Sequence, residues 1–102
     1  MEYYTVRFDS YSTRSFRGTL IAYLATNTGE GFASVRHCSV YKTDDNQYLC
    51  SVVEHIDGLQ PFYKSGIYFN KEGILDFFGK DVVGYRIMWL VNDCELGNRQ
   101  VA

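Results

Sequence analysis

The chain has little of the material that several classes of protein depend on. One proline stands among 102 residues, two residues are histidines, and the formal net charge is −2. Domains that bind the nucleic-acid backbone usually carry a marked basic surplus, so the overall charge counts against that role. It is also too small for a protein that imitates DNA. No apolar run approaches the roughly 18 residues that span a bilayer, and we expect no membrane partner.

Cysteine is scarce as well. The three cysteines, Cys38, Cys50 and Cys94, are odd in number, and their spacing matches neither a zinc site nor a redox pair. The chain starts directly in a strand pattern without a targeting segment, so we expect a cytoplasmic protein with reduced thiols. Whether these thiols do more than fill a core is left open.

Common catalytic and cofactor motifs are also missing. The sequence contains no G-x-S-x-G elbow, no Cys–His family signature and no glycine-rich phosphate loop. His37 and His55 stand on different expected strands, and nothing in the sequence brings them to one metal ion. We therefore expect no catalytic residue, no metal and no cofactor, and a protein that works by binding rather than as an enzyme.

Aromatic residues are abundant instead. Nine tyrosines, seven phenylalanines and one tryptophan make up 17% of the chain, beside 46% hydrophobic and 22% charged residues. These proportions are those of a folded globular protein. Tyrosine and tryptophan join a large ring to a polar group, which suits half-buried strands and interfaces. We expect a single α+β domain over residues 1–93 and a C-terminal tail over residues 94–102.

Hydrophobic periodicity predicts several strands. Residues 2–9 alternate between apolar and polar positions, as a half-buried strand does. Residues 32–42 and 47–56 are rich in β-branched and aromatic side chains and flank a polar turn at 43–46, which predicts a hairpin. Residues 82–91 are apolar on both faces, which is typical of a central strand.

Two further segments have helical features. Asn70 is placed to cap a short helix that Gly79 would end. Between Phe16 and Leu24 the apolar positions recur at helical spacing, so residues 16–26 are expected to form a helix, with a strand as the alternative.

The resulting order is strand, helix, two strands, helix and strand. This βαββαβ order is the ferredoxin-like α+β fold, with an antiparallel sheet and two short helices on one face. If residues 16–26 form a strand, the alternative is a mostly-β roll with one short helix. The ferredoxin-like order leaves one sheet face uncovered, and an aromatic-rich uncovered face favours a homodimer or a tight contact with another protein.

The segment 56–66 offers the best predicted protein contact. It places Leu59, Phe62 and Tyr63 around the rigid Pro61, whereas long loops are usually polar. The other residues expected to bind a partner lie on the first strand and in the hairpin turn: Tyr3, Arg7, Asp44 and Asp45. We expect a small non-enzymatic protein that binds and occludes a protein partner, as a phage or mobile-element inhibitor of a host or defence protein would.

A competing interpretation centres on Asp9, Arg14 and Arg17. Arginines interleaved with aromatic rings suit single-stranded nucleic acid. An acidic residue at the end of the first strand, followed by two arginines and by residues 39–41 and 86–87, resembles the small ferredoxin-like nucleases of the VapD type. That resemblance implies a nucleic-acid-binding or metal-dependent nuclease domain in which Asp9 holds a divalent metal.

Overall fold

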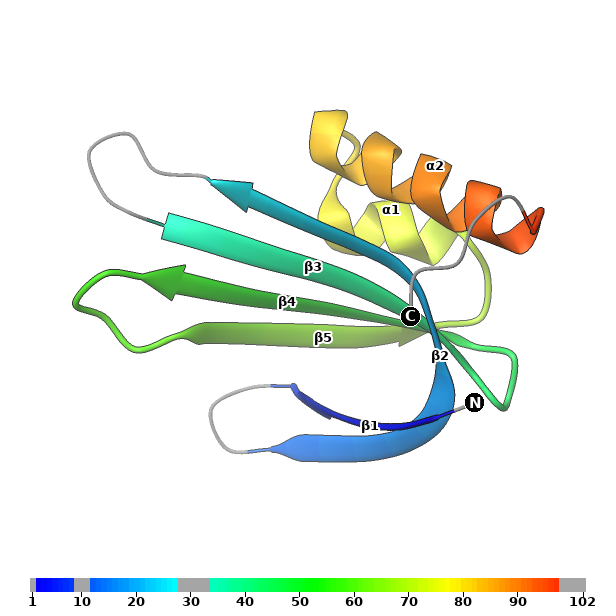
Figure 1. Cartoon of the computed structure of the whole chain (residues 1–102), viewed down its shortest axis with the longest axis horizontal. Helices are drawn as coiled ribbons and strands as arrows, with labels where there is room; N and C mark the ends of the chain where they lie inside the picture. Colours follow the sequence, from blue (N-terminus) through cyan, green and yellow to red (C-terminus); the bar gives the residue numbers. More distant parts are fainter. Residues whose placement is uncertain (1, 9–11, 28–33, 98–102) are drawn as a thin grey trace.

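The computed structural model describes residues 2–8, 12–27 and 34–97 and shows five strands followed by two helices (Figure 1). The elements in chain order are β1 (Glu2–Arg7), β2 (Thr13–Asn27), β3 (Ser34–Thr43), β4 (Tyr48–Ile56), β5 (Phe62–Tyr68), α1 (Glu72–Phe78) and α2 (Val82–Glu95). Neighbouring strands are antiparallel and form one sheet in chain order, from β1 to β5. Both helices lie on one face of this sheet (Figure 1).

The predicted fold is confirmed only in its coarse form. The chain is α+β, with an antiparallel sheet and two helices on one face. The ferredoxin-like βαββαβ order is not confirmed, because all five strands precede both helices. The alternative prediction, a mostly-β roll, had only one short helix, whereas the described structure has two helices.

The hairpin predicted around residues 43–46 is present. The β3–β4 pairing runs from Ser34 opposite Ile56 to Lys42 opposite Tyr48. The short helix predicted after Asn70 is α1. Gly79 follows its last residue with φ +101°, a conformation that glycine adopts without strain.

Residues 16–26 belong to the long strand β2 and do not form a helix. The pairing of β2 with β3 changes register between Leu20 and Ala22, which marks a β-bulge. Before the bulge, Phe16 packs among rings of β1 and β3. Beyond it, Ala22 and Leu24 pack under the helices. A bulge shifts the alternation of faces, so the apolar residues of this bent strand have the spacing of a helix.

Residues 82–91 form most of helix α2 and not a central strand. The Asp81 carboxylate accepts a hydrogen bond of 3.0 Å from the backbone N–H of Gly84, which caps the helix. Apolar side chains lie on both its sheet-facing and its outward side, and periodicity cannot distinguish such a helix from a buried strand. The helix continues through Glu95, into the segment expected to be a tail. Within the described ranges neither helix is long and apolar enough to cross a membrane.

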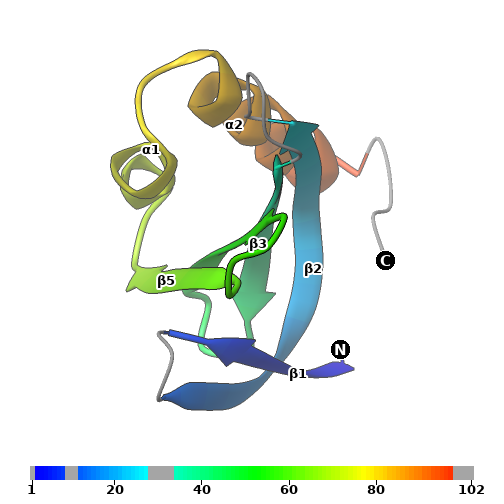
Figure 2. The ribbon, with the colours of Figure 1, turned by 90° about the vertical axis from the view of Figure 1, so that its left-hand side faces the viewer.

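The sheet buries side chains on both faces. The helix-side core joins the middle strands to the two helices, and its most buried members are Ala22, Cys38, Val40, Cys50, Ile74, Ile87 and Val91. On the other side, β1 and the first half of β2 fold beneath the remaining strands (Figure 2). Val6 and Leu49 are buried on this side of the sheet, called the hairpin side because the β1–β2 hairpin covers it. The rings of Tyr4, Phe16 and Tyr41 meet there with centroid distances from 4.7 to 5.6 Å.

The end of α2 is fixed to the sheet by polar contacts. The Tyr48 hydroxyl donates a 2.8 Å hydrogen bond to Glu95 Oε1. Burial, together with this nearby carboxylate, raises the pKa of Tyr48 to about 12, so the hydroxyl keeps its proton. Lys71 Nζ lies 3.6 Å from Glu95 Oε2 and links the start of α1 to the same carboxylate.

The cysteines differ in accessibility. Cys38 and Cys50 are buried in the helix-side core, whereas Cys94 is half-buried at its edge, and all three are free thiols. Burial raises the pKa of Cys50 to about 12 and also raises that of Cys38, and only a thiolate reacts quickly with disulfide reagents. We predict that a thiol-reactive disulfide labels Cys94 alone in the native protein, measured by the absorbance of the released thiolate. A Cys94→Ser variant should lose this phase, and rapid native labelling of two or more thiols would contradict the packing described.

Candidate partner-binding site

The predicted contact loop supplies two exposed apolar side chains at one end of the sheet. Leu59 is 67% exposed in the β4–β5 connection, and Phe62 is 57% exposed at the start of β5. The Phe62 side chain lies on the helix side, where it lines a hollow. Tyr63 is the next residue of the strand and therefore points to the opposite face. Residues 62 and 63 were expected to lie in a loop, but they are the first two residues of strand β5, which places their rings on two different surfaces.

Tyr63 meets another predicted residue on that opposite face. The guanidinium carbon of Arg7 lies 4.9 Å from the centroid of the Tyr63 ring. The Ser65 hydroxyl donates a 2.8 Å hydrogen bond to the backbone carbonyl of Arg7. These contacts bring β5 beside the end of β1, because the sheet is curled. Tyr3 is an exposed residue of the same strand β1.

Asp44 and Asp45 lie in the β3–β4 turn beside the residues of the nuclease interpretation. Together with Arg14 and Arg17 they line a cleft of about 210 Å³. The backbone N–H of Asp44 donates a 2.9 Å hydrogen bond to the carbonyl of Arg17. Two carboxylates beside two arginines oppose the attraction of phosphate to this cleft. Asp9 lies outside the described residues, and among those that are described no three metal-ligating side chains form a group.

Phe62 lines a helix-side hollow with a volume of about 230 Å³. Strands β3, β4 and β5 and both helices contribute to the hollow. Its lining residues are Arg36, Cys38, Val52, Glu54, Phe62, Lys64, Phe77, Phe78 and Val83. The sheet forms its floor, and the C-terminal end of α1 and the first turn of α2 form one wall.

The hollow combines apolar surface with fixed charges. The rings of Phe77 and Phe78 meet edge to face with centroids 4.8 Å apart. Lys64 Nζ lies 5.1 Å from the centroid of Phe77, which places a cation over that ring. Arg36 Nη2 and Nε lie 2.9 and 3.0 Å from Glu54 Oε2 across β3 and β4. The arginine and the glutamate therefore already pair with each other, and among the described lining residues the lysine is the cation left to meet an incoming group.

The wall of the hollow depends on the junction between the helices. Gly79 ends α1, and its N–H donates a 2.8 Å hydrogen bond to the Leu75 carbonyl. Asp81 then caps α2 two residues later. This short connection fixes Phe78 and Val83 beside each other at the rim. Sequence reasoning missed the hollow because its walls come from separate elements. Asp81, just before the apolar run 82–91, is a helix-cap signal that the sequence analysis did not use.

A second surface was also missed, on the sheet face away from the helices. Strand register places one ring on each of four strands there: Tyr23, His37, His55 and Tyr63. Tyr23 Oη lies 2.5 Å from His37 Nδ1, and the rings of His37 and His55 have centroids 5.7 Å apart. The sequence contained these rings, but only the register brings them to one face.

No family model, no curated protein and no solved structure matches the chain, so its function is inferred from these contacts.

Proposed function

We propose that this protein is a non-enzymatic interaction protein that binds a protein partner through the helix-side hollow. The observation that carries the proposal is Phe62, a largely exposed ring at the mouth of a hollow lined by Phe77 and Phe78. A partner that inserts an apolar side chain into the hollow would bury Phe62 and the exposed part of Phe78, with the already buried Phe77 beneath them. Large aromatic anchors beside a pocket are the usual centre of binding energy in protein interfaces.

The magnitudes fit a binding role. Covering the exposed part of Phe62 would contribute roughly 1–2 kcal/mol from removal of apolar surface alone. Lys64 would attract a carboxylate of the partner, because Arg36 and Glu54 already form an ion pair beside it. Asp44 and Asp45 lie in the turn at the other end of β4, so we propose that they steer approach rather than contact the same partner group.

Occlusion is the mechanism that we propose for any effect on the partner. The hollow is lined by paired strands and by two helices joined through a short connection, and a partner seated there would have its bound surface covered sterically. Inhibition of a host or defence protein by a phage or mobile-element product is one biological setting for such a mechanism.

The test compares Phe62→Ala with Phe69→Ala. Phe69 is the matched control, because it is an exposed phenylalanine just after the other end of β5 and does not line the hollow. A protein captured from host extract after nuclease treatment would be purified and titrated against each variant. We expect Phe62→Ala to weaken binding by at least about tenfold and Phe69→Ala to leave it unchanged. Equal affinities for the two variants would reject the hollow as the binding site.

A second candidate function is binding of single-stranded nucleic acid on the ring-bearing sheet face. The observation that favours it is the row of four rings with Arg7 against Tyr63, since bases stack on such rings. The same titration with a single-stranded RNA discriminates the candidates. Binding that Tyr63→Ala weakens and Phe62→Ala leaves unchanged would transfer the function to this face.

A further inference from the structure

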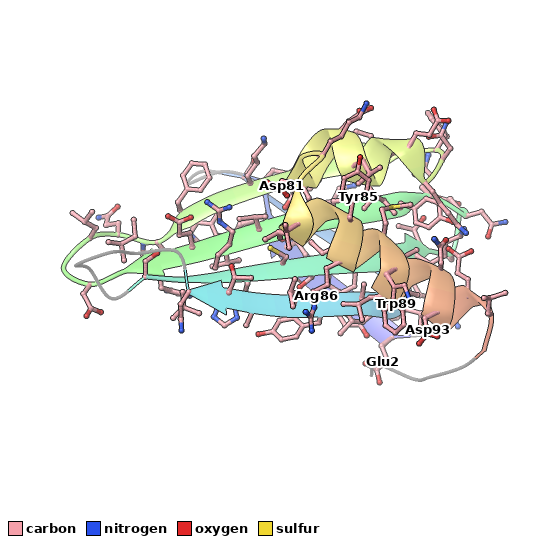
Figure 3. The ribbon with its side chains drawn as sticks, turned by 90° about the horizontal axis from the view of Figure 1, so that it is seen from above. Glu2, Asp81, Tyr85, Arg86, Trp89 and Asp93 are labelled. Atoms are coloured by element: carbon pink, nitrogen blue, oxygen red, sulfur yellow. The ribbon has the colours of Figure 1, made fainter. Side chains whose placement is uncertain are left out.

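The outward side of α2, with its C-cap residue Leu96, carries an apolar stripe that packs on no other described part of the fold. Val82, Tyr85, Trp89 and Leu96 are 82%, 56%, 63% and 76% exposed. Figure 3 shows Tyr85 and Trp89 on the outer surface of the helix. The sheet-facing side of α2 is separate and complete, since Gly84, Ile87 and Val91 are buried there. The stripe lies apart from the hollow and therefore goes beyond the proposed function.

The spacing of the stripe is that of a helix-pairing seam. Val82, Trp89 and Leu96 recur every seven residues, and Tyr85 falls three residues after the first of them. Apolar residues at these intervals form one line along a helix and pack against a second helix. Large exposed apolar side chains in a continuous line mark an interaction surface more often than scattered single residues do.

The stripe is nearly symmetrical about Trp89. Val82 precedes it by seven residues and Leu96 follows it by seven. Arg86 and Asp93 flank the stripe on the same side and stand on either side of Trp89 along the helix (Figure 3). A two-fold axis near Trp89 would bring Val82 of one chain to Leu96 of the other.

We propose that two copies of this protein pair through α2, with the helices antiparallel and Trp89 at the two-fold axis. In that arrangement the same flank of each helix meets its copy, so Arg86 faces the partner's Asp93 and Asp93 faces the partner's Arg86. A parallel pair would instead bring Arg86 beside the other edge of the stripe, where Tyr85 and the neighbouring Asn92 lie and no carboxylate stands. Charge complementarity therefore favours a second copy of the same helix, in the antiparallel direction. The same surface of both copies then forms the interface, as in an isologous dimer.

A membrane surface is a poorer occupant of this stripe. Helices that lie on membranes carry several lysines and arginines on the polar side, whereas α2 has one arginine and also acidic residues. The mixed charges of one flank suit a second copy of the same helix.

The experiment measures association of the full chain by sedimentation equilibrium. Wild-type protein should form a species of twice the chain mass of 11.8 kDa. Arg86→Asp and Asp93→Arg should each weaken the dimer by at least about tenfold, because each places like charges face to face twice. An equimolar mixture of these two variants should restore the dimer, and so should the double variant.

Trp89 provides an independent readout, because it is the sole tryptophan of the chain. Its fluorescence maximum should move to shorter wavelength as the wild-type concentration rises, and Phe69→Ala should behave like wild type. A single-chain mass at every concentration would overturn the proposal. So would a mixture of folded single variants, checked by circular dichroism, that fails to associate. If a single variant does not fold, the wild-type mass and fluorescence still decide the outcome.

Discussion

Gly84→Ala is expected to lower the free energy of unfolding by about 3 kcal/mol or more, a large effect for the addition of one methyl group. A Cβ at position 84 would overlap the backbone carbonyl oxygen of Gly79. That oxygen cannot move easily, because Gly79 is held by its N–H bond to Leu75 at the end of α1. Helix propensity alone would favour alanine by about 1 kcal/mol, so the overlap decides the sign.

The measurement is urea unfolding followed by circular dichroism, with thermal unfolding beside it. A loss of this size should lower the melting temperature by more than about 12 °C in a domain of this length. Gly58→Ala is the control, since no atom lies near its Cβ position and its cost comes only from a positive φ of +81°. We expect about 1 kcal/mol for the control. If Gly84→Ala and Gly58→Ala lost the same free energy of unfolding, the helix junction would be able to relax around the added methyl group, and the prediction would be wrong.

Leu49→Ala is expected to cost about 2–5 kcal/mol of stability, the second largest effect. Leu49 is fully buried and, with Ile74 and Ile87, is one of the largest fully buried side chains among the described residues. It lies on the hairpin side of the sheet, so its loss leaves a cavity that the helices cannot fill. Denaturant unfolding of Leu49→Ala beside Leu59→Ala tests this, because the exposed Leu59 should cost less than about 0.5 kcal/mol.

A double variant separates the two cores. Ile74→Ala removes a fully buried side chain on the helix side, and the sheet lies between it and Leu49. The two losses should add within about 0.5 kcal/mol if the cores are independent. A strongly non-additive result would mean that the two sides of the sheet form one cooperative packing unit.

Sequence patterns correctly predicted two elements whose signals lie within a short stretch of chain, the β3–β4 hairpin and helix α1. The β3–β4 hairpin was recognisable because its turn at 43–46 and both strands carry consistent propensities. The short helix α1 was recognisable from Asn70 and Gly79 for the same reason. In β2 the bulge at Leu20 and Ala22 changed the phase of an otherwise regular strand, and no local rule marks where a bulge falls.

The rest depended on tertiary context. The run 82–91 has apolar residues on both its inward and its outward side. Because of the outward ones, the helical spacing of the buried residues could not be recognised in the sequence. The hollow requires Phe62 from β5 to lie near Phe78 and Val83 from the helices, which depends on the strand order and on how the helices pack on the sheet. The aromatic segment was predicted to be a loop, whereas its second half is strand β5, and the alternation of that strand puts Phe62 and Tyr63 on opposite faces.

Both helices follow all five strands in the chain, and this order has a consequence for synthesis. At the usual rates of about 5–20 residues per second, a ribosome takes roughly 1–5 s to add residues 69–95 after the last strand. During that interval the nascent sheet exposes the apolar residues that α1 and α2 later cover, among them Ala22, Val40 and Cys50. We therefore expect a chain that ends after β5 to present one uncovered sheet face to chaperones or to neighbouring chains.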